Sequence, residues 1–315
     1  MNKPSIPFLA AKGYVNTPDW ITALQRAMPN EKIVLFDDMN AEDRATCTVA
    51  IVANPNPAEI QDLPNLRWVH SVWAGVERLV AALENTNLKI VRLVDPQLAK
   101  TMAEAVIAWT LYLHRDIPTY AKQQKKQLWK AMDYIRPENK TIGLLGLGAL
   151  GQAAAQRLLL SDFNVCGWSR NPAQVAGVEC FSGDNGLKTM LQKTDILISL
   201  LPLTSETKGL LDARRFAYLP DGASFINFSR GAIVNDDDLR DVLNNRHIKH
   251  AVLDVFDVEP LPVSQWQWEH PNVTVLPHCS GPTDRETASA IVAGNIERYR
   301  NEGEIPRSID ISRGY

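Results

Sequence analysis

The sequence predicts an α/β protein built from two doubly wound parallel-sheet domains, one of them inserted into the other. Strand-like and helix-like segments alternate along the chain, which is the pattern of parallel sheets covered by helices. A glycine-rich turn joins a strand to a helix near residue 146, and a long helical segment follows the last strand. We therefore expect residues 98–283 to form the inserted domain, and residues 1–97 with 284–315 to form the other.

The composition is that of a globular protein with more than one core. The chain has 315 residues, 45% of them hydrophobic and 22% charged. Its net charge of −3 gives no electrostatic reason to expect a nucleic-acid or membrane partner. The four cysteines form no C-x-x-C pair, and the first residues, MNKPSIPFLAAKG, are too proline-broken for a signal peptide. These features predict reduced thiols and a cytoplasmic protein.

Residues 1–95 are expected to form a parallel sheet with covering helices. The five candidate strands are short apolar segments: Ile6–Ala10, Lys32–Phe36, Thr48–Ala53, Arg67–Val72 and Leu88–Leu93. A helix is expected over Pro18–Met28, because Trp20 and Leu24 share one face and Pro18 suits a first helical turn. This half has no glycine-rich phosphate motif, so we expect no cofactor site in it.

A long helix is expected from Pro96 to about Arg115. Its apolar residues recur at helical spacing and predict a buried stripe: Leu98, Met102, Val106, Trp109 and Leu113. The segment Tyr120–Lys140 that follows is basic and rich in glutamine. It is expected to be either a solvated arm or a subunit contact.

The glycine-rich turn has the sequence G-x-G-x-x-G, at Gly146, Gly148 and Gly151. It follows the apolar strand Thr141–Leu145 and opens a helix that ends near Leu160. In this context the glycines allow a tight turn, close approach of a pyrophosphate and close packing of helix on strand. A packing turn and a membrane span are the alternatives, and the polar residues of the helix argue against the span. The motif predicts a Rossmann domain with a dinucleotide site.

The strand–helix alternation continues after this motif. The candidate strands are Asn164–Trp168, Asp195–Leu201, Ser224–Phe228, His250–Phe256 and Val273–Leu276. Helices are expected over Asp236–Asn244 and Asp284–Asn301, and the latter should return to the N-terminal domain. The cleft between two such domains is the expected site.

Four polar residues stand at expected strand ends, where open α/β sheets bind ligands. They are Arg230, Asp254, Glu259 and His278. Arginine can bind a planar carboxylate with two parallel hydrogen bonds. Taken singly, each has a plain alternative as a surface arginine, a loop carboxylate or a structural histidine. The histidine pair at residues 247 and 250 lacks the further ligands of a metal site, so no metal is expected.

Several longer motifs of the second half form a more specific pattern. GLGALG, LLPLTSETKGLL, INFSRGAIVNDDDL, LDVFDVEPLP and LPHCSGPT resemble those of the D-isomer-specific 2-hydroxyacid dehydrogenases, over most of residues 98–283. The earlier SVWAGVERL adds a similarity to the bacterial glyoxylate/hydroxypyruvate reductases of the A type. The resemblance implies a Rossmann cofactor domain inserted into a flavodoxin-like substrate domain, and a homodimer through the cofactor domain.

The resemblance also implies reduction of small 2-keto acids, such as glyoxylate and hydroxypyruvate, by hydride transfer. Arg230 would hold the substrate carboxylate and polarise the carbonyl, His278 would be the general acid, and Glu259 would keep His278 protonated. Trp73, Ala74 and Gly75 would bind substrate together with Arg230 and His278. Asp254 would meet the nicotinamide carboxamide. The implied cofactor-binding residues are Gly146, Gly148, Ala149, Leu150, Gly151, Ser169, Arg170, Leu201, Pro202, Thr207, Phe228, Ser229, Asp254 and Ser280.

The cofactor type is expected from the end of the second strand of the Rossmann domain. NAD enzymes of this fold place an acidic residue about 20 positions after the first glycine, to bind the ribose 2′-hydroxyl. Here Ser169 and Arg170 stand at that point, and no acidic residue follows before Glu179. Serine and arginine suit a 2′-phosphate, so NADP(H) is favoured over NAD(H). The alternative is that Arg170 stacks on the adenine and both cofactors bind.

Two other functions fit the same fold. One is an NAD-linked dehydrogenase of another D-2-hydroxy acid, and the other is a nucleotide-sensing binding protein. A sensor needs only the nucleotide site, so the presence of Arg230, Glu259 and His278 together favours an enzyme.

Overall fold

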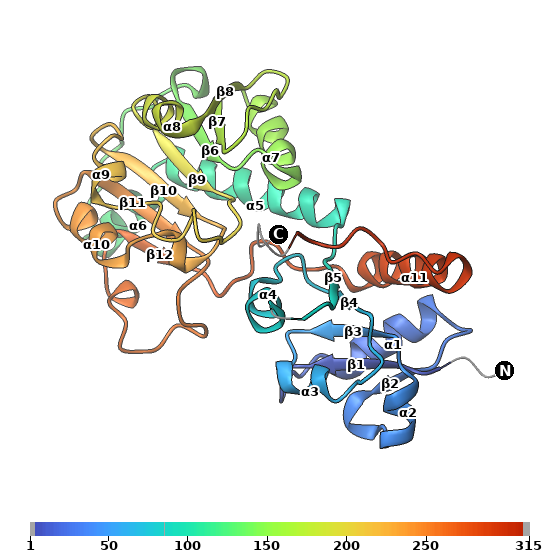
Figure 1. Ribbon diagram of the computed structural model, residues 1–315. Coiled ribbons are helices and arrows are strands. Elements are labelled where there is room, and N and C mark those ends of the chain that lie inside the picture. Colours follow the sequence, from blue (N-terminus) through green and yellow to red (C-terminus); the bar gives the residue numbers. More distant parts are fainter. Residues whose placement is uncertain (1–3, 85, 311–315) are drawn as a thin grey trace. The chain divides into compact units, whose positions relative to one another are not determined.

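The computed structural model describes residues 4–84 and 86–310 of the chain (Figure 1). The chain divides into two compact units, Met1–Gln97 with Thr283–Tyr315 and Leu98–Pro282. Residues 311–315 of the predicted 284–315 segment, and residues 1–3 of the N-terminal segment, lie outside the described residues. The first unit is therefore made from both ends of the chain, and the second from its middle.

The first unit contains one parallel sheet of five strands. Their order is β2 (Ile33–Leu35), β1 (Ile6–Ala10), β3 (Val49–Ala53), β4 (Trp68–Ser71) and β5 (Lys89–Val91). This 2-1-3-4-5 order is the flavodoxin-like one. The central strands β1 and β3 are apolar on both faces, because helices cover the sheet on both sides.

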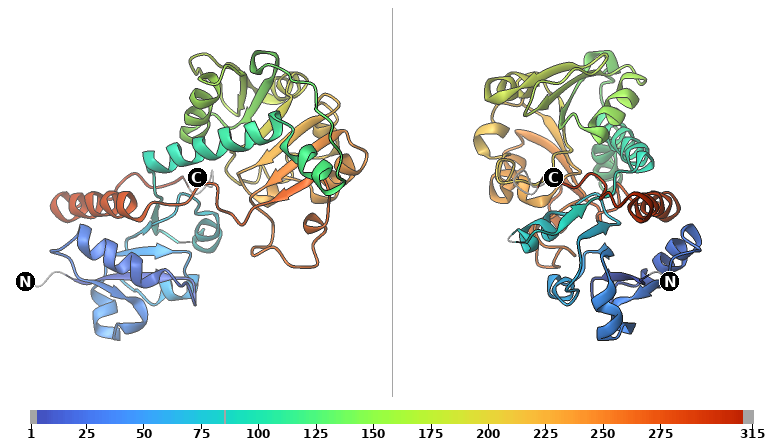
Figure 2. Two further views of the ribbon diagram at one scale, coloured as in Figure 1. Left: turned by 180° about the vertical axis from the view of Figure 1, so that it is seen from behind. Right: turned by 45° about the vertical axis from the view of Figure 1, so that its right-hand side comes forward.

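Two helices from opposite ends of the chain pack together on one face of this sheet. Helix α1 (Thr17–Ala27) contributes Trp20 and Leu24 to the core, and α11 (Arg285–Glu302) contributes Val292 and Ile296. The two helices lie side by side (Figures 1 and 2). The shorter helices α3 (Pro57–Gln61) and α4 (Glu77–Leu83) contribute to the other core cluster of this unit, whereas α2 (Ala41–Thr46) has no buried residue.

The second unit contains a parallel sheet of seven strands. Their order is β12 (Val273–Val275), β11 (Ile248–Leu253), β10 (Ala223–Asn227), β9 (Ile196–Ser199), β6 (Thr141–Leu145), β7 (Asn164–Ser169) and β8 (Glu179–Ser182). Counted within the unit, this is the Rossmann order 3-2-1-4-5-6 with one further strand. The order reverses between β6 and β9, and ligands bind at the carboxyl ends of strands at such a point.

Helices cover both faces of the second sheet. Residues of α5 (Pro96–His114) and α7 (Ala149–Leu159) share one core cluster with β6, and residues of α8 (Gly183–Leu191), α9 (Ala213–Phe216) and α10 (Asp236–Asn244) share another. Helix α6 (Ile117–Lys125) occupies the first part of the basic segment. Short 3-10 turns lie at Phe36–Asp38, Pro137–Asn139, Gly231–Ile233 and Trp266–Trp268. Among the described helices, none is long and apolar enough to cross a membrane.

Two doubly wound parallel sheets confirm the predicted α/β class, although several strand ends differ from the prediction. Strand β8 was not predicted, because Glu179–Ser182 is a half-exposed edge strand without an apolar run. The predicted strand His250–Phe256 instead spans Ile248–Leu253. The predicted strands that reached Leu201 and Phe228 end earlier, at Ser199 and Asn227. The polar residues Ser199 and Asn227 therefore lie at the carboxyl ends of strands β9 and β10.

Candidate active site

The glycine turn after β6 forms a cradle with one open position. Gly146 has a φ of +103°, and a Cβ on it would lie 3.0 Å from the Leu200 carbonyl oxygen. A Cβ on Gly151 would lie 1.9 Å from the Gly146 carbonyl oxygen, so helix α7 starts directly against the turn. By contrast, nothing lies within 4 Å of the Cβ position of Gly148. Two glycines are therefore required by packing, and the third leaves room for a ligand.

The start of helix α7 supplies hydrogen-bond donors beside this open position. Gly148 is the N-cap residue, and the Gln152 N–H donates to the Gly148 carbonyl oxygen at 2.9 Å. The N–H groups of Ala149 and Leu150 precede this first hydrogen bond of the helix, so the helix itself provides no carbonyl acceptor for them. Such a helix end binds phosphate well. The cradle therefore fits the pyrophosphate of a dinucleotide.

The predicted 2′-phosphate residues follow the neighbouring strand β7. Ser169 ends that strand, and its Oγ donates to the Asn171 carbonyl oxygen at 2.7 Å. The Arg170 Nη1 lies 2.5 Å from the Glu206 Oε2. The sequence motifs did not single out Glu206. Gly146 donates its N–H to the Trp168 carbonyl oxygen at 2.8 Å, so the end of β7 lies directly beside the glycine turn.

The other predicted cofactor residues of this loop region are largely engaged within the protein. The Thr207 Oγ1 donates to the Pro202 carbonyl oxygen at 2.7 Å and accepts from the Thr204 N–H at 2.8 Å. Leu201 and Phe228 are buried. These side chains shape the loops, so any contact they make with a nucleotide would have to come from backbone atoms or apolar surface.

The loop that carries Arg230 is fixed by polar residues at the ends of β9 and β10. The buried Ser229 Oγ lies 2.8 Å from the Ser199 Oγ and donates to the Asn227 Oδ1 at 2.6 Å. The Asn227 Nδ2 donates to the Arg230 carbonyl oxygen at 3.1 Å, and the Arg230 Nη1 donates to the Ser229 carbonyl oxygen at 2.7 Å. Ser229, which was predicted to bind cofactor, thus uses its hydroxyl to hold this loop.

Gly231 brings the Arg230 loop against the loop that carries Glu259. A Cβ on Gly231 would lie 2.2 Å from the Phe256 carbonyl carbon and 2.3 Å from the Asp257 nitrogen. Any larger residue would push the two loops apart. Glycine is therefore required here by close backbone packing.

Glu259 and His278 form a hydrogen-bonded pair. The His278 Nδ1 lies 2.7 Å from the Glu259 Oε2, and the Glu259 Oε1 accepts from the Phe256 N–H at 2.9 Å. The hydrogen bond with Glu259 raises the pKa of His278 above its ordinary value, against the opposing effects of burial and of the Arg230 charge. Burial alone would raise the pKa of Glu259, but its hydrogen bonds to His278 and Phe256 outweigh this and lower it. The pair therefore favours a protonated His278 beside an ionised Glu259.

Asp254 holds the His278 segment in place, which the sequence motifs did not predict. Its two carboxylate oxygens accept from the Cys279 N–H at 2.7 Å and from the Ser280 N–H at 3.0 Å. His278 itself has a φ of +51°, a left-handed conformation that is uncommon outside glycine. The buried Asp254 clamp offsets the cost of that conformation. The hydroxyl of Ser280 is buried without a partner among the described residues, which suits a polar ligand such as a carboxamide.

The structure thus brings together the three residues predicted to be catalytic. Glu259 and His278 share a hydrogen bond, and Gly231 packs the loop of Arg230 against residues 256–257 of the loop that carries Glu259. In keeping with this proximity, the Arg230 charge lowers the pKa of both Glu259 and His278. They come from the loops after β10 and β11 and from the segment after β12. Trp73, Ala74 and Gly75 lie in the first unit, and their predicted role in substrate binding stays a prediction.

A partly buried set of hydrogen bonds supports the loop of Trp73 from within its own unit. The Asn295 Nδ2 of helix α11 lies 2.9 Å from the His70 Nε2, and the His70 Nδ1 lies 2.9 Å from the Ser71 carbonyl oxygen. Burial lowers the pKa of His70 to about 4, so the ring is neutral and its Nδ1–H donates. The Ser71 Oγ then accepts from the Trp73 N–H at 3.0 Å. Sequence reasoning missed these hydrogen bonds because Asn295 lies 225 residues from His70 in the sequence.

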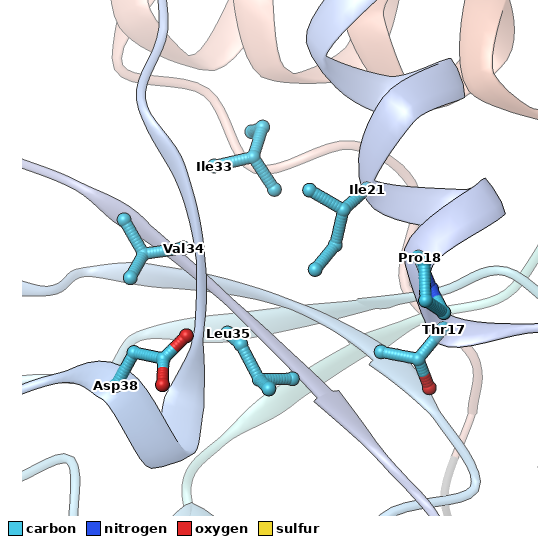
Figure 3. A pocket seen from close by; sticks show the side chains of 7 residues that line it. All are labelled: Thr17, Pro18, Ile21, Ile33, Val34, Leu35 and Asp38. Atoms are coloured by element: carbon cyan, nitrogen blue, oxygen red, sulfur yellow. The ribbon is translucent and has the colours of Figure 1, made fainter. Parts of the chain in front are cut away.

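The first unit contains a pocket that none of the predicted site residues lines. It has a volume of about 420 Å³ and lies between helix α1, the edge strand β2 and the turn that follows (Figure 3). The side chains that line it are mostly aliphatic: Thr17, Pro18, Ile21, Ile33, Val34, Leu35 and Asp38. With one carboxylate and one hydroxyl, this lining offers no set of catalytic groups.

Replacing Glu259 by glutamine should shift to lower pH the activity of any reaction in which His278 acts as a general acid. Glutamine cannot stabilise the imidazolium, so the pKa of His278 should fall. A general acid must be protonated, so the rate is highest below this pKa and is lost as the pH rises through it. The descending limb of the kcat/KM profile should therefore begin at lower pH in Glu259→Gln. An unchanged profile would remove Glu259 from the mechanism.

Comparisons with known proteins show which family this chain resembles. The family described as "D-isomer specific 2-hydroxyacid dehydrogenase, NAD binding domain" matches residues 107–280. Glyoxylate/hydroxypyruvate reductase A of Serratia proteamaculans is 34% identical over 309 residues, which cover 96% of this chain and 97% of that protein.

Solved structures of similar proteins extend the comparison to the fold. A D-isomer specific 2-hydroxyacid dehydrogenase from Xanthobacter autotrophicus, in complex with NADPH and MES, has a TM-score of 0.91 and 36% identity, over 99% of this chain and 100% of that chain. An NADPH-dependent glyoxylate/hydroxypyruvate reductase from Sinorhizobium meliloti, in complex with NADP and sulfate, has a TM-score of 0.90 and 30% identity over the same shares.

Proposed function

This chain belongs to the D-isomer specific 2-hydroxyacid dehydrogenase family, and from that premise we propose that it is an NADPH-dependent reductase of small 2-keto acids. Glyoxylate and hydroxypyruvate are the proposed substrates, since similar proteins are named for them. The observation that carries the proposal is the grouping of Arg230, Glu259 and His278 in the unit that holds the glycine cradle. We assign cofactor binding to residues 98–282, and we propose that the first unit adds substrate contacts to those of Arg230 and His278.

The proposed mechanism gives each of the three residues one role. NADPH, when bound, supplies the hydride. Arg230 binds the carboxylate of the keto acid and polarises its carbonyl group by charge. The Nδ1 of His278 is engaged by Glu259, which leaves the Nε2 to donate a proton to the carbonyl oxygen. Glu259 orients the ring and stabilises the imidazolium before that transfer.

We propose that backbone N–H groups of Ala74 and Gly75 bind the same substrate carboxylate. Of the neighbouring loop N–H groups, that of Trp73 is already bound to the Ser71 Oγ. The hydrogen-bond chain through His70 and Ser71 keeps the loop in one conformation, which suits binding of a small anion by backbone donors.

An activity assay tests the proposed function and separates it from its alternatives. Steady-state rates are measured with glyoxylate, hydroxypyruvate and a panel of other 2-keto acids, each with NADPH and with NADH. Turnover of glyoxylate or hydroxypyruvate with NADPH supports the proposal. Turnover only with NADH and another keto acid would indicate an NAD-linked dehydrogenase. Nucleotide binding without turnover of any keto acid would indicate a sensor.

Cofactor preference should depend on the residues that follow β7. In Ser169→Asp/Arg170→Ala the new carboxylate would repel a 2′-phosphate and offer an acceptor to a 2′-hydroxyl. We expect the ratio of kcat/KM for NADPH and NADH to move toward NADH by at least about tenfold, or about 1.4 kcal/mol. Turnover at saturating cofactor should change little, because the hydride leaves from the other end of the molecule. A constant ratio would exclude Arg170 as the discriminating residue.

We further propose a homodimer that forms through the cofactor-binding unit. Exposed apolar side chains gather on α6 and the segment after it: Ile117, Tyr120, Leu128, Trp129, Tyr134 and Ile135. Trp129 is fully exposed, and an apolar surface of this kind is typical of an interface. Trp129→Glu should convert the dimer to a monomer in sedimentation velocity, whereas Val15→Glu, at an exposed apolar residue of the other unit, should not. A wild-type monomer would contradict the proposal.

A cytoplasmic location is proposed from the state of the thiols. All four cysteines, Cys47, Cys166, Cys180 and Cys279, are unpaired. Free thiols persist in reducing compartments. Use of NADPH and a small keto acid also requires no nucleic-acid or membrane partner.

A further inference from the structure

The ion pair of Arg170 and Glu206 crosses the carboxyl end of strand β6. Arg170 directly follows β7, and Glu206 lies in the loop after β9. Strands β7 and β9 are the two neighbours of β6 in the sheet. The two side chains therefore meet from both sides of the strand that carries the glycine turn. In this fold the adenosine of a dinucleotide binds near the ends of these strands.

Glu206 is presented from a turn that is fixed by its own hydrogen bonds. The turn spans residues 204–207, and the Thr207 Oγ1 bonds to the Thr204 N–H and the Pro202 carbonyl oxygen. The position of Glu206 is thus set by the protein. The ion pair itself is exposed, at 38% for the Arg170 side chain and 61% for that of Glu206. An exposed pair of this kind is weak, so a more highly charged ligand can replace it.

We propose that Glu206 limits the preference for NADP(H) by competing with the ribose 2′-phosphate for Arg170; this rests on the proposed NADP(H) use. The 2′-phosphate carries nearly two negative charges and binds an arginine fork better than one carboxylate does. To form that contact, it must displace Glu206 from Arg170 and tolerate its negative charge nearby. A nucleotide with a free 2′-hydroxyl leaves the ion pair intact. Glu206 therefore weakens the binding of NADP(H) and leaves that of NAD(H) nearly unchanged.

The test compares two small nucleotides that differ only in the 2′-phosphate. Adenosine 2′,5′-bisphosphate and adenosine 5′-monophosphate are titrated calorimetrically into the full chain, followed by NADPH and NADH. The variants are Glu206→Gln and, as a matched control, Glu179→Gln. Glu179 forms a similarly exposed ion pair with Lys193 at 2.8 Å in the same unit. Both variants remove one negative charge.

Glu206→Gln should tighten binding of the bisphosphate and of NADPH about three- to tenfold, because a neutral glutamine neither competes strongly for Arg170 nor repels the 2′-phosphate. Binding of the monophosphate and of NADH should change less than about twofold, as should all binding to Glu179→Gln. In an Arg170→Ala background most of the gain should vanish, because the two residues would no longer be coupled.

Unchanged or weaker bisphosphate binding in Glu206→Gln would overturn the proposal, since Glu206 would then be neutral or would hold Arg170 in position for the phosphate. An equal gain in Glu179→Gln, or a full gain in the Arg170→Ala background, would also overturn it. If the wild type binds NADPH no better than NADH, the NADP(H) proposal itself fails. If it prefers NADPH while Glu206→Gln is neutral, only the role of Glu206 fails.

Discussion

Replacing Arg230 by alanine should lower kcat/KM for the keto acid by a factor between about thirty and several thousand. Loss of one partner of a close, partly buried charge pair costs about 2–5 kcal/mol. Affinity for NADPH should stay within about twofold, because the proposed pyrophosphate and 2′-phosphate contacts lie at the glycine turn and after β7. The measurements are steady-state kinetics with glyoxylate and fluorescence titration of NADPH.

Two further variants separate charge from geometry in this experiment. Arg230→Lys keeps the charge and loses the planar fork, so its activity should lie between those of wild type and Arg230→Ala. Arg240→Ala removes an exposed arginine of helix α10 and should leave both parameters unchanged. Retention of more than a tenth of wild-type kcat/KM in Arg230→Ala would refute the assigned role.

Replacing His278 by asparagine should lower kcat by about a hundredfold to ten-thousandfold, the usual contribution of a general acid. Asparagine is the better test than alanine, because residue 278 has a φ of +51° and asparagine tolerates the left-handed conformation. The pH dependence assigned to His278 should disappear together with the rate. Kinetics over a range of pH and a thermal unfolding curve measure both effects.

The thermal unfolding curve controls for damage to the fold. His278→Asn should unfold within a few degrees of wild type and bind NADPH with similar affinity. His278→Ala should show the same loss of activity with lower stability, because alanine adds backbone strain of roughly 1 kcal/mol or more. A His278→Asn protein that keeps more than a tenth of wild-type kcat, with an unchanged pH profile, would exclude His278 as the general acid.

Much of the fold could be predicted because it is encoded locally. Strands β1 and β6 and helix α10 have the bounds expected from the sequence. An apolar run, a helical stripe or a capping residue depends only on near neighbours in the chain. Where the local signal was weak, as in the edge strand β8, the prediction failed. Strand ends were predicted less accurately, because apolar residues continue past the last strand residue: Leu200 and Leu201 follow β9, and Phe228 follows β10.

The candidate site depends both on the local sequence and on the tertiary structure. The sequence determined the glycine turn and the identity of Arg230, Glu259 and His278, because their spacing follows a recognisable family pattern. Only the tertiary structure decided what holds them: the Asp254 clamp on the His278 segment, and the contact of Gly231 with residues 256–257. The pair of Arg170 and Glu206 spans 36 residues, and that of His70 and Asn295 spans 225. Such contacts are set by the order in which strands and helices pack, and a local sequence window contains no record of that order.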